Sequence, residues 1–104
     1  MTIRTTNKSA RLYVQNQAPF QGSNVFGEFT NDQYTVYRYG YHFPLFIYDH
    51  TNRQWLENDD SYSKTTTRHR LQLRPTQHTI KCTTEQMQAV IRAGVITGII
   101  QDPN

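Results

Sequence analysis

One stretch of the sequence decides the fold, because its residues alternate in character over eight positions: Gln33-Tyr34-Thr35-Val36-Tyr37-Arg38-Tyr39-Gly40. Successive side chains of a β-strand point to opposite faces. As a strand, the stretch places its odd-numbered side chains, Thr35, Tyr37 and Tyr39, on one face and its even-numbered ones on the other. The β-branched and aromatic content is typical of strands, so this is the strongest strand prediction in the chain.

The flanking residues extend this strand into an antiparallel meander. Residues 25–29 and 43–49 alternate in a similar way, and a turn-forming segment leads from there into a further strand at 54–56. We expect Gly27 at a bulge or at a close approach of neighbouring groups. Proline cannot donate to a strand ladder, so Pro44 is expected at a strand start, an edge or a bulge.

The two ends of the chain carry different patterns. Residues 1–10 are polar and rich in threonine, and we expect them to be flexible. Residues 11–16 alternate well enough to predict a short first strand. Residues 84–93 carry an apolar stripe at helical spacing, and Thr83 with Gln86 completes a capping box in front of it. A helix is therefore predicted at 84–93.

The segment 63–74 is ambiguous between strand and helix. As a helix capped near Ser63 it would hold three consecutive threonines, residues 65–67, and β-branched side chains are poor in helix interiors. We therefore favour a strand, which Pro75 would end. The resulting fold class is α+β: a small antiparallel sheet of four or five strands with the C-terminal helix packed on one face, in a single domain over residues 11–101.

The composition limits what the chain can be. Its 104 residues suit one domain, and its formal net charge is +3. The single cysteine, Cys82, excludes an internal disulfide and is expected to be a small buried hydrophobe. No apolar run approaches the ~20 residues of a membrane helix, and residues 1–10 lack the apolar segment of a signal peptide. An intracellular location is expected.

Cationic side chains gather in one segment that has no acidic residue. Residues 61–84 hold five lysines and arginines and two histidines, and seven of the fifteen residues at 34–48 are aromatic. This combination is typical of surfaces that hold phosphates and stack bases. On a strand, the arginines would project about 6.6–7 Å apart for every two residues, close to the phosphate step of an extended nucleic acid. The predicted contact residues are Lys64, Arg68, Arg70, Arg74, Tyr37 and Tyr39.

Simpler explanations exist for both features. The cationic side chains would form an ordinary solvated face if they paired with Glu57, Asp59 and Asp60 in surface salt bridges. About half of the aromatic rings, with Trp55 and Phe46 among them, are expected to build the core.

Catalysis and metal binding receive less support. His69 lies near hydroxyl and carboxylate residues, as hydrolytic chemistry requires, yet no nucleophile motif accompanies it. His42 and His50 have no spacing that favours a metal. We therefore predict a protein that is not an enzyme and that needs no cofactor.

Two strings in the middle of the chain resemble a known group. They are Tyr39-Gly-Tyr-His-Phe-Pro44 and Tyr62-Ser-Lys-Thr-Thr-Thr-Arg-His69, and together with neighbouring positions they are similar to a family of small uncharacterised proteins from bacteriophages, plasmids and other mobile elements. The likeness covers roughly residues 25–98. It implies a mobile-element accessory protein acting in the host cytoplasm, without implying a mechanism. Its matched polar positions would form one cluster if they converge: His42, Tyr62, Ser63, Arg68 and His69.

Three functions follow from this sequence. The first is non-enzymatic binding of nucleic acid, or of a nucleoprotein complex, through the basic face. The alternative is a protein–protein inhibitor of a host defence system, as anti-CRISPR proteins are, and the third is a small hydrolase or nuclease that depends on His69. No membrane partner is expected. The protein is expected to be a monomer or a homodimer, the latter if the apolar residues 95–100 complete a sheet across two copies.

Overall fold

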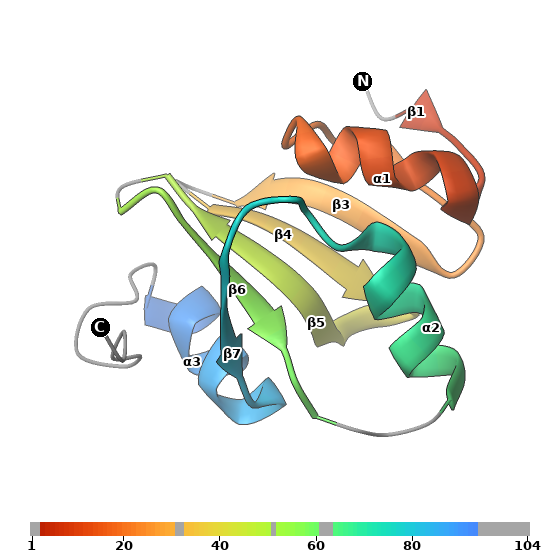
Figure 1. Cartoon of the computed structure of the whole chain (residues 1–104). Helices are drawn as coiled ribbons and strands as arrows, with labels where there is room; N and C mark the ends of the chain where they lie inside the picture. The colour runs from red at the N-terminus through yellow and green to blue at the C-terminus, as the bar shows by residue number, and fades with distance from the viewer. Residues whose placement is uncertain (1–2, 31–32, 51, 61–63, 94–104) are drawn as a thin grey trace.

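The computed structural model describes residues 3–30, 33–50, 52–60 and 64–93 (Figure 1). Within them, seven strands form one mixed sheet in the order β1-β2-β3-β4-β5-β6-β7. The α+β class is confirmed, but the sheet is larger than the predicted four or five strands. The elements in chain order are β1 Ile3–Arg4, α1 Asn7–Gln15, β2 Phe20–Gln21, β3 Val25–Thr30, β4 Gln33–Arg38, β5 Gly40–Asp49, β6 Gln54–Asn58, α2 Lys64–Leu73, β7 Thr79–Cys82 and α3 Thr84–Ala93.

The centre of the sheet is the antiparallel meander that the sequence predicts. Strands β2 to β6 pair with their neighbours in antiparallel fashion, and Val36 of β4 lies opposite Phe46 of β5. The next pair, Tyr37 opposite Pro44, follows a register shift, so Pro44 occupies an irregularity as expected. The prediction missed the two edges, where β1 and β7 each pair in parallel with a neighbour. Parallel neighbours need a crossover connection, which α1 and α2 supply.

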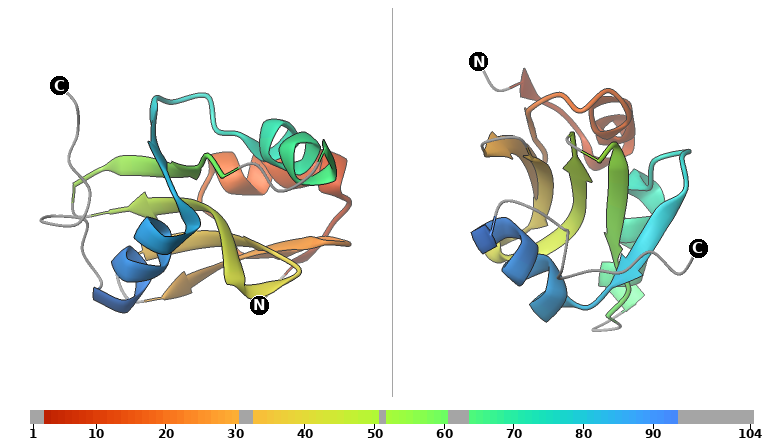
Figure 2. Two further views of the ribbon diagram at one scale, coloured as in Figure 1. Left: turned by 90° about the horizontal axis from the view of Figure 1, so that it is seen from below. Right: turned by 90° about the vertical axis from the view of Figure 1, so that its left-hand side faces the viewer.

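Helices cover both faces of the sheet, with α1 and α2 side by side on one face and α3 on the other (Figure 2). The face under α1 and α2 carries the larger core, in which Trp55, Tyr34 and Phe46 are buried. The face under α3 carries a smaller core that includes Met87 and Cys82. The expected burial of Trp55, Phe46 and Cys82 is confirmed.

The first helix replaces the strand that we expected at residues 11–16. Thr6 caps α1, and its Oγ1 accepts a hydrogen bond from the Ser9 amide at 3.2 Å. Ala10 and Val14, four residues apart, are fully buried, whereas Leu12 is 68% exposed. This pattern has the helical period, so the strand prediction was wrong because it paired Leu12 with Val14. The segment that was expected to be flexible contains β1 and the beginning of α1.

The second helix replaces the strand that we favoured at residues 63–74. Leu71 and Leu73 would share a face on a strand, but Leu71 is 55% exposed and Leu73 is fully buried. The preference of the threonines for strands is overridden by the tertiary structure, because the parallel pair β6–β7 requires a crossover and α2 can bury Leu73 beside α1. The prediction that the segment ends before Pro75 is confirmed.

The third helix is the one predicted at 84–93. The Thr83 amide donates to Gln86 Oε1 at 2.8 Å, and the Gln86 amide donates to Thr83 Oγ1 at 3.1 Å. These reciprocal bonds are the predicted capping box. The apolar residues 95–100 lie outside the described residues.

Gly27 is buried where three strands meet, as its sequence position predicts. A Cβ atom there would lie 2.5 Å from Tyr34 Oη and 2.7 Å from Phe20 Cε1. Neither neighbour is free to move, because the Tyr34 hydroxyl donates to the Ala18 carbonyl oxygen at 2.7 Å and the Phe20 ring is fully buried. The absence of a side chain at Gly27 therefore allows the Tyr34 ring to reach the N-terminal part of the core.

Candidate functional site

A buried carboxylate gathers cationic side chains on the face that α1 and α2 cover. Glu57 is 1% exposed. Its Oε1 lies 3.0 Å from Arg74 Nε and 3.0 Å from Lys81 Nζ, and its Oε2 lies 3.4 Å from Arg70 Nε. Thr79 Oγ1 donates to the same carboxylate at 2.6 Å. We call these five residues the Glu57 cluster.

The secondary structure explains why these residues meet. Lys81 of β7 pairs directly with Glu57 of β6 in the parallel ladder, so their side chains emerge on the same face. Arg70 lies in the last turn of α2, and Arg74 is the first residue after the helix ends at Leu73. The crossover thus aims both arginines at the carboxylate.

The charge of Glu57 is held in place by its neighbours. Burial alone would raise the pKa of the carboxyl, but hydrogen bonds from Thr79 and Lys81 and the charges of Lys81 and Arg74 outweigh it and lower the pKa. Arg70 also lies 3.2 Å from Asp59 Oδ1. Three cations, Arg70, Arg74 and Lys81, thus lie around the one buried carboxylate of Glu57.

An open groove runs along the exposed side of the cluster. Its volume is about 540 Å³, and it is lined by residues 74–79 and Lys81. Within the described residues no carboxylate lines it, because Glu57 lies beneath the surface. The side chains of Arg74 and Lys81 keep 43% and 42% of their area exposed while Glu57 fixes their positions. We call this feature the basic groove.

Arg11 of α1 adds a further positive charge at the edge of the basic groove. Its Nε donates to the Arg74 carbonyl oxygen at 3.2 Å. The loop that follows Arg74 is also fixed by α1, since the Thr76 amide donates to Gln15 Oε1 at 2.9 Å and Gln15 Nε2 donates to Gln77 Oε1 at 3.0 Å. The groove is therefore a preformed feature of the fold.

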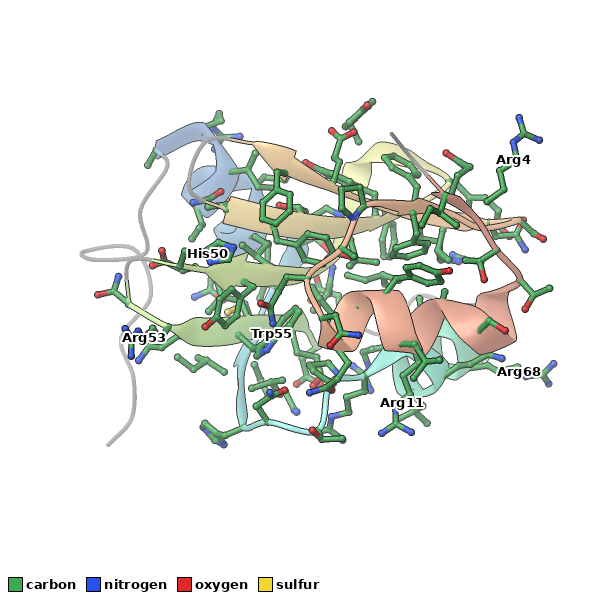
Figure 3. All side chains as sticks on the ribbon, turned by 90° about the horizontal axis from the view of Figure 1, so that it is seen from above. Arg4, Arg11, His50, Arg53, Trp55 and Arg68 are labelled. Carbon is green, nitrogen blue, oxygen red and sulfur yellow. The ribbon has the colours of Figure 1, made fainter. Side chains whose placement is uncertain are left out.

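The predicted basic residues do not form one continuous strip. On a helix Arg68 and Arg70 point in different directions, so Arg70 turns to Glu57 while Arg68 is exposed and points outward (Figure 3). The regular spacing expected for a strand was wrong for this reason. The side chain of Lys64 lies outside the described part of the chain. Arg70 and Arg74 have the pairing with acidic residues that the simpler explanation expected, and Arg74 still reaches the surface.

The predicted stacking tyrosines differ in their exposure. Tyr37 is 3% exposed and packs against Phe26 and Tyr41, with ring centroids 5.2 Å and 5.0 Å away, so it has no face for a base. Tyr39 is 62% exposed, and the Arg38 guanidinium lies 4.2 Å from the centroid of its ring. Tyr39 also lines a cavity of about 380 Å³ at β2 and β3, on strands distant from the basic groove.

The polar cluster that the resemblance implies lies largely outside the described residues. Tyr62 and Ser63 precede α2 in an undescribed segment, and the side chains of His42 and His69 are likewise not described. Among the side chains that the structure does describe, no three histidines, cysteines or carboxylates gather where they could hold a metal ion.

A second cavity next to the groove was not predicted. It measures about 250 Å³ and lies between the end of α1 and the β5–β6 hairpin, with Trp55, Tyr48 and Arg53 among its lining residues. The basic groove and this Trp55 cavity share Gln77 and His78. Within the described residues no carboxylate lines either of them, so the two form one polar surface of positive charge.

Two local features lie at the Trp55 cavity. Trp55 is 2% exposed, and its buried Nε1 has no hydrogen-bond acceptor within the described residues. A buried donor left without a partner costs about 1–3 kcal/mol. Gln17 and Arg53, which line the cavity, have φ values of 49° and 53°. Gln17 follows the C-cap of α1, where its amide donates to the Val14 carbonyl oxygen at 3.0 Å and the Ala18 amide donates to the Tyr13 carbonyl oxygen at 2.8 Å. These are the two bonds of a Schellman motif, so the positive φ of Gln17 belongs to the end of the helix.

Comparison with known proteins adds no family to this picture, because no protein family, curated protein or solved structure matches the chain. None of the described helices is long and apolar enough to cross a membrane.

Proposed function

We propose that this protein binds nucleic acid without catalysing a reaction, and that the basic groove holds the phosphates. One observation carries the proposal: the buried Glu57 fixes Arg74 and Lys81 at the surface of a groove in whose described lining no carboxylate occurs. Guanidinium and ammonium groups are the usual phosphate ligands, and fixed ones lose less conformational freedom on binding. The resemblance of the sequence adds the setting, a mobile-element accessory protein that acts on nucleic acid or a nucleoprotein complex in the host cytoplasm.

The geometry favours a phosphate contact over a purely structural ion cluster. A structural role would need one cation to neutralise Glu57, yet three cations lie within 3.4 Å of its carboxylate oxygens. Arg11 increases the excess at the edge of the groove. Concentrated positive charge attracts polyanions at long range and binds them with strong salt dependence.

The test is fluorescence anisotropy with short labelled single and double strands of DNA and RNA at several salt concentrations. The double variant Arg74→Gln/Lys81→Gln should bind every strand more weakly, and each lost phosphate contact should reduce the salt slope by about one. Glu57 keeps Arg70 and Thr79 as partners in this variant, so the fold should survive, as circular dichroism will report. The matched control is Arg92→Gln with Arg4→Gln, two exposed residues of other elements.

Equal binding by the double variant and the control would overturn the proposal, as would no binding at low salt. The alternative would then be a protein partner, such as a component of a host defence system, contacted through the exposed rings of Tyr39 and Tyr41. Exposed tyrosines are frequent energetic centres of protein interfaces. That alternative requires stoichiometric complex formation that replacement of these two tyrosines abolishes.

A further inference from the structure

The Trp55 cavity has the chemistry of a site for a flat, uncharged and polar group. Its aromatic lining residues, Tyr48 and Trp55, have ring centroids 5.0 Å apart. Three glutamines, Gln17, Gln54 and Gln77, also line it, and a carboxamide both donates and accepts hydrogen bonds. Nucleobases carry donors and acceptors on their edges and stack through their faces.

The carboxamides that line the cavity are held in position. The Gln17 and Gln77 amides are already oriented, since Gln17 Nε2 donates to the Gln15 carbonyl oxygen and Gln77 Oε1 accepts from Gln15 Nε2.

The position of the cavity links it to the basic groove. Gln77 and His78 line both, so a ligand that extends from one to the other passes over these two residues. A nucleotide has this form, with a phosphate on one side of its sugar and a base on the other. Paired bases are stacked inside a duplex, so only an unpaired nucleotide can place its base in the cavity.

We propose that the Trp55 cavity receives one unstacked base of a single-stranded nucleic acid whose phosphates lie in the basic groove. This inference rests on the proposed function, which it deepens by naming single strands as the preferred ligand. Gln17 and Arg53, held at positive φ, form the rim on the side of α1 and of the hairpin. The base forms hydrogen bonds with the carboxamides of Gln17 and Gln77 and stacks on the half-buried ring of Tyr48.

The test uses the fluorescence of Trp55, which is the only tryptophan of the chain. A single strand and an abasic sugar-phosphate strand of equal length are titrated against the full chain. The base-containing strand should quench Trp55 and bind roughly tenfold more tightly, as expected for one stacked base. The abasic strand should bind through its phosphates without quenching.

The variant Gln17→Gly separates the base from the phosphates. Glycine adopts positive φ without strain, so the fold should be retained while the carboxamide is lost. The variant should lose most of the preference for the base-containing strand and bind the abasic strand as before. The control Arg92→Gln, on the other face of the sheet, should keep the preference.

The outcomes distinguish this inference from the proposed function. Equal affinity and equal fluorescence changes for both strands would overturn the cavity as a base site and leave the phosphate groove standing. Absence of binding by either strand would overturn the proposed function. In that case a titration with free nucleosides would test the cavity alone. Quenching of Trp55 fluorescence that Gln17→Gly removes would support the cavity as a base site, and no quenching would refute it.

Discussion

Replacing Gly27 with alanine tests how the core is built around the Tyr34 ring. The added Cβ would lie 2.5 Å from Tyr34 Oη, 2.7 Å from Phe20 Cε1 and 2.9 Å from Phe20 Cδ1. All three distances are shorter than any real Cβ contact, so the neighbours must shift. Overpacking of a core costs about 1–3 kcal/mol, and we expect about 3 kcal/mol here because the Tyr34 hydroxyl is hydrogen-bonded and Phe20 is fully buried.

The assay is thermal and urea unfolding of Gly27→Ala, Tyr34→Phe and the double variant. For a domain of this size, the single glycine change should lower the Tm by about 10–20 °C. Tyr34→Phe alone should cost about 1 kcal/mol through its lost hydrogen bond to Ala18. In the double variant the closest clashing atom is gone, so its destabilisation should fall short of the sum of the single effects by about 1 kcal/mol or more. Phe20 still obstructs the new methyl group, so the rescue should be partial.

Two results would refute this reasoning. Gly27→Ala within about 0.5 kcal/mol of the natural protein would mean that the strands separate easily at this point. Strict additivity in the double variant would mean that Tyr34 Oη is not the atom that excludes a side chain at Gly27.

Two further predictions concern buried ionisable groups. Glu57→Gln should destabilise the fold by about 2 kcal/mol at neutral pH, a modest loss because its cationic partners are partly exposed. The pKa of Glu57 is lowered in the fold from 4.5, so its contribution to the free energy of unfolding should be present above about pH 4.5 and lost as the pH falls through the folded pKa. Urea unfolding at pH 7 and pH 3 should show this loss in the natural protein but not in the variant. Equal pH dependence of the two proteins would contradict the prediction. Burial raises the pKa of Cys82 from 9.0 to about 11, so its thiol should react with a disulfide reagent at least about a hundredfold more slowly than free cysteine until denaturant is added. Rapid modification under native conditions would show that the smaller core opens.

The meander was predictable because its information is local. Alternation at residues 25–49 and the turn-forming residues between the strands are sufficient to pair β3, β4 and β5. The capping box at Thr83 likewise lies within a few residues of the helix that it begins. Both features depend on residues that are close together in the sequence, and such local patterns are the ones that a single sequence shows most directly.

The helices α1 and α2 were missed because distant contacts decide them. Short apolar patterns such as Leu12 with Val14 fit either period, and the burial of Ala10 and Val14 becomes evident only when the sheet is present. The threonines of α2 prefer strands, but the parallel pairing of β6 and β7 imposes a crossover. Local preference is a weak guide when tertiary packing opposes it.

The importance of Glu57 had a signal in the sequence that was read only as a surface charge. In β6 it lies two residues after Trp55 and so shares a face with the chain's largest core residue. A carboxylate on a buried face needs cationic partners, and the next segment of the chain is rich in them. The Trp55 cavity had no such signal, since it is formed by the ends of elements far apart in sequence.

The crossover connection from β6 to β7, which contains α2, also determines the order in which the strands of the sheet assemble. Strands β3 to β6 are joined by short connections and can pair early, whereas β7 can dock only after the chain has returned along α2. The basic groove lies on that returning segment, so it is completed last and should open first. We therefore expect the amides of β7 to exchange their hydrogens sooner than those of β4 and β5. A polyanion in the groove would slow this exchange, because it would hold Arg74 and Lys81 together. Ligand binding would therefore be coupled to the docking of β7 on the sheet.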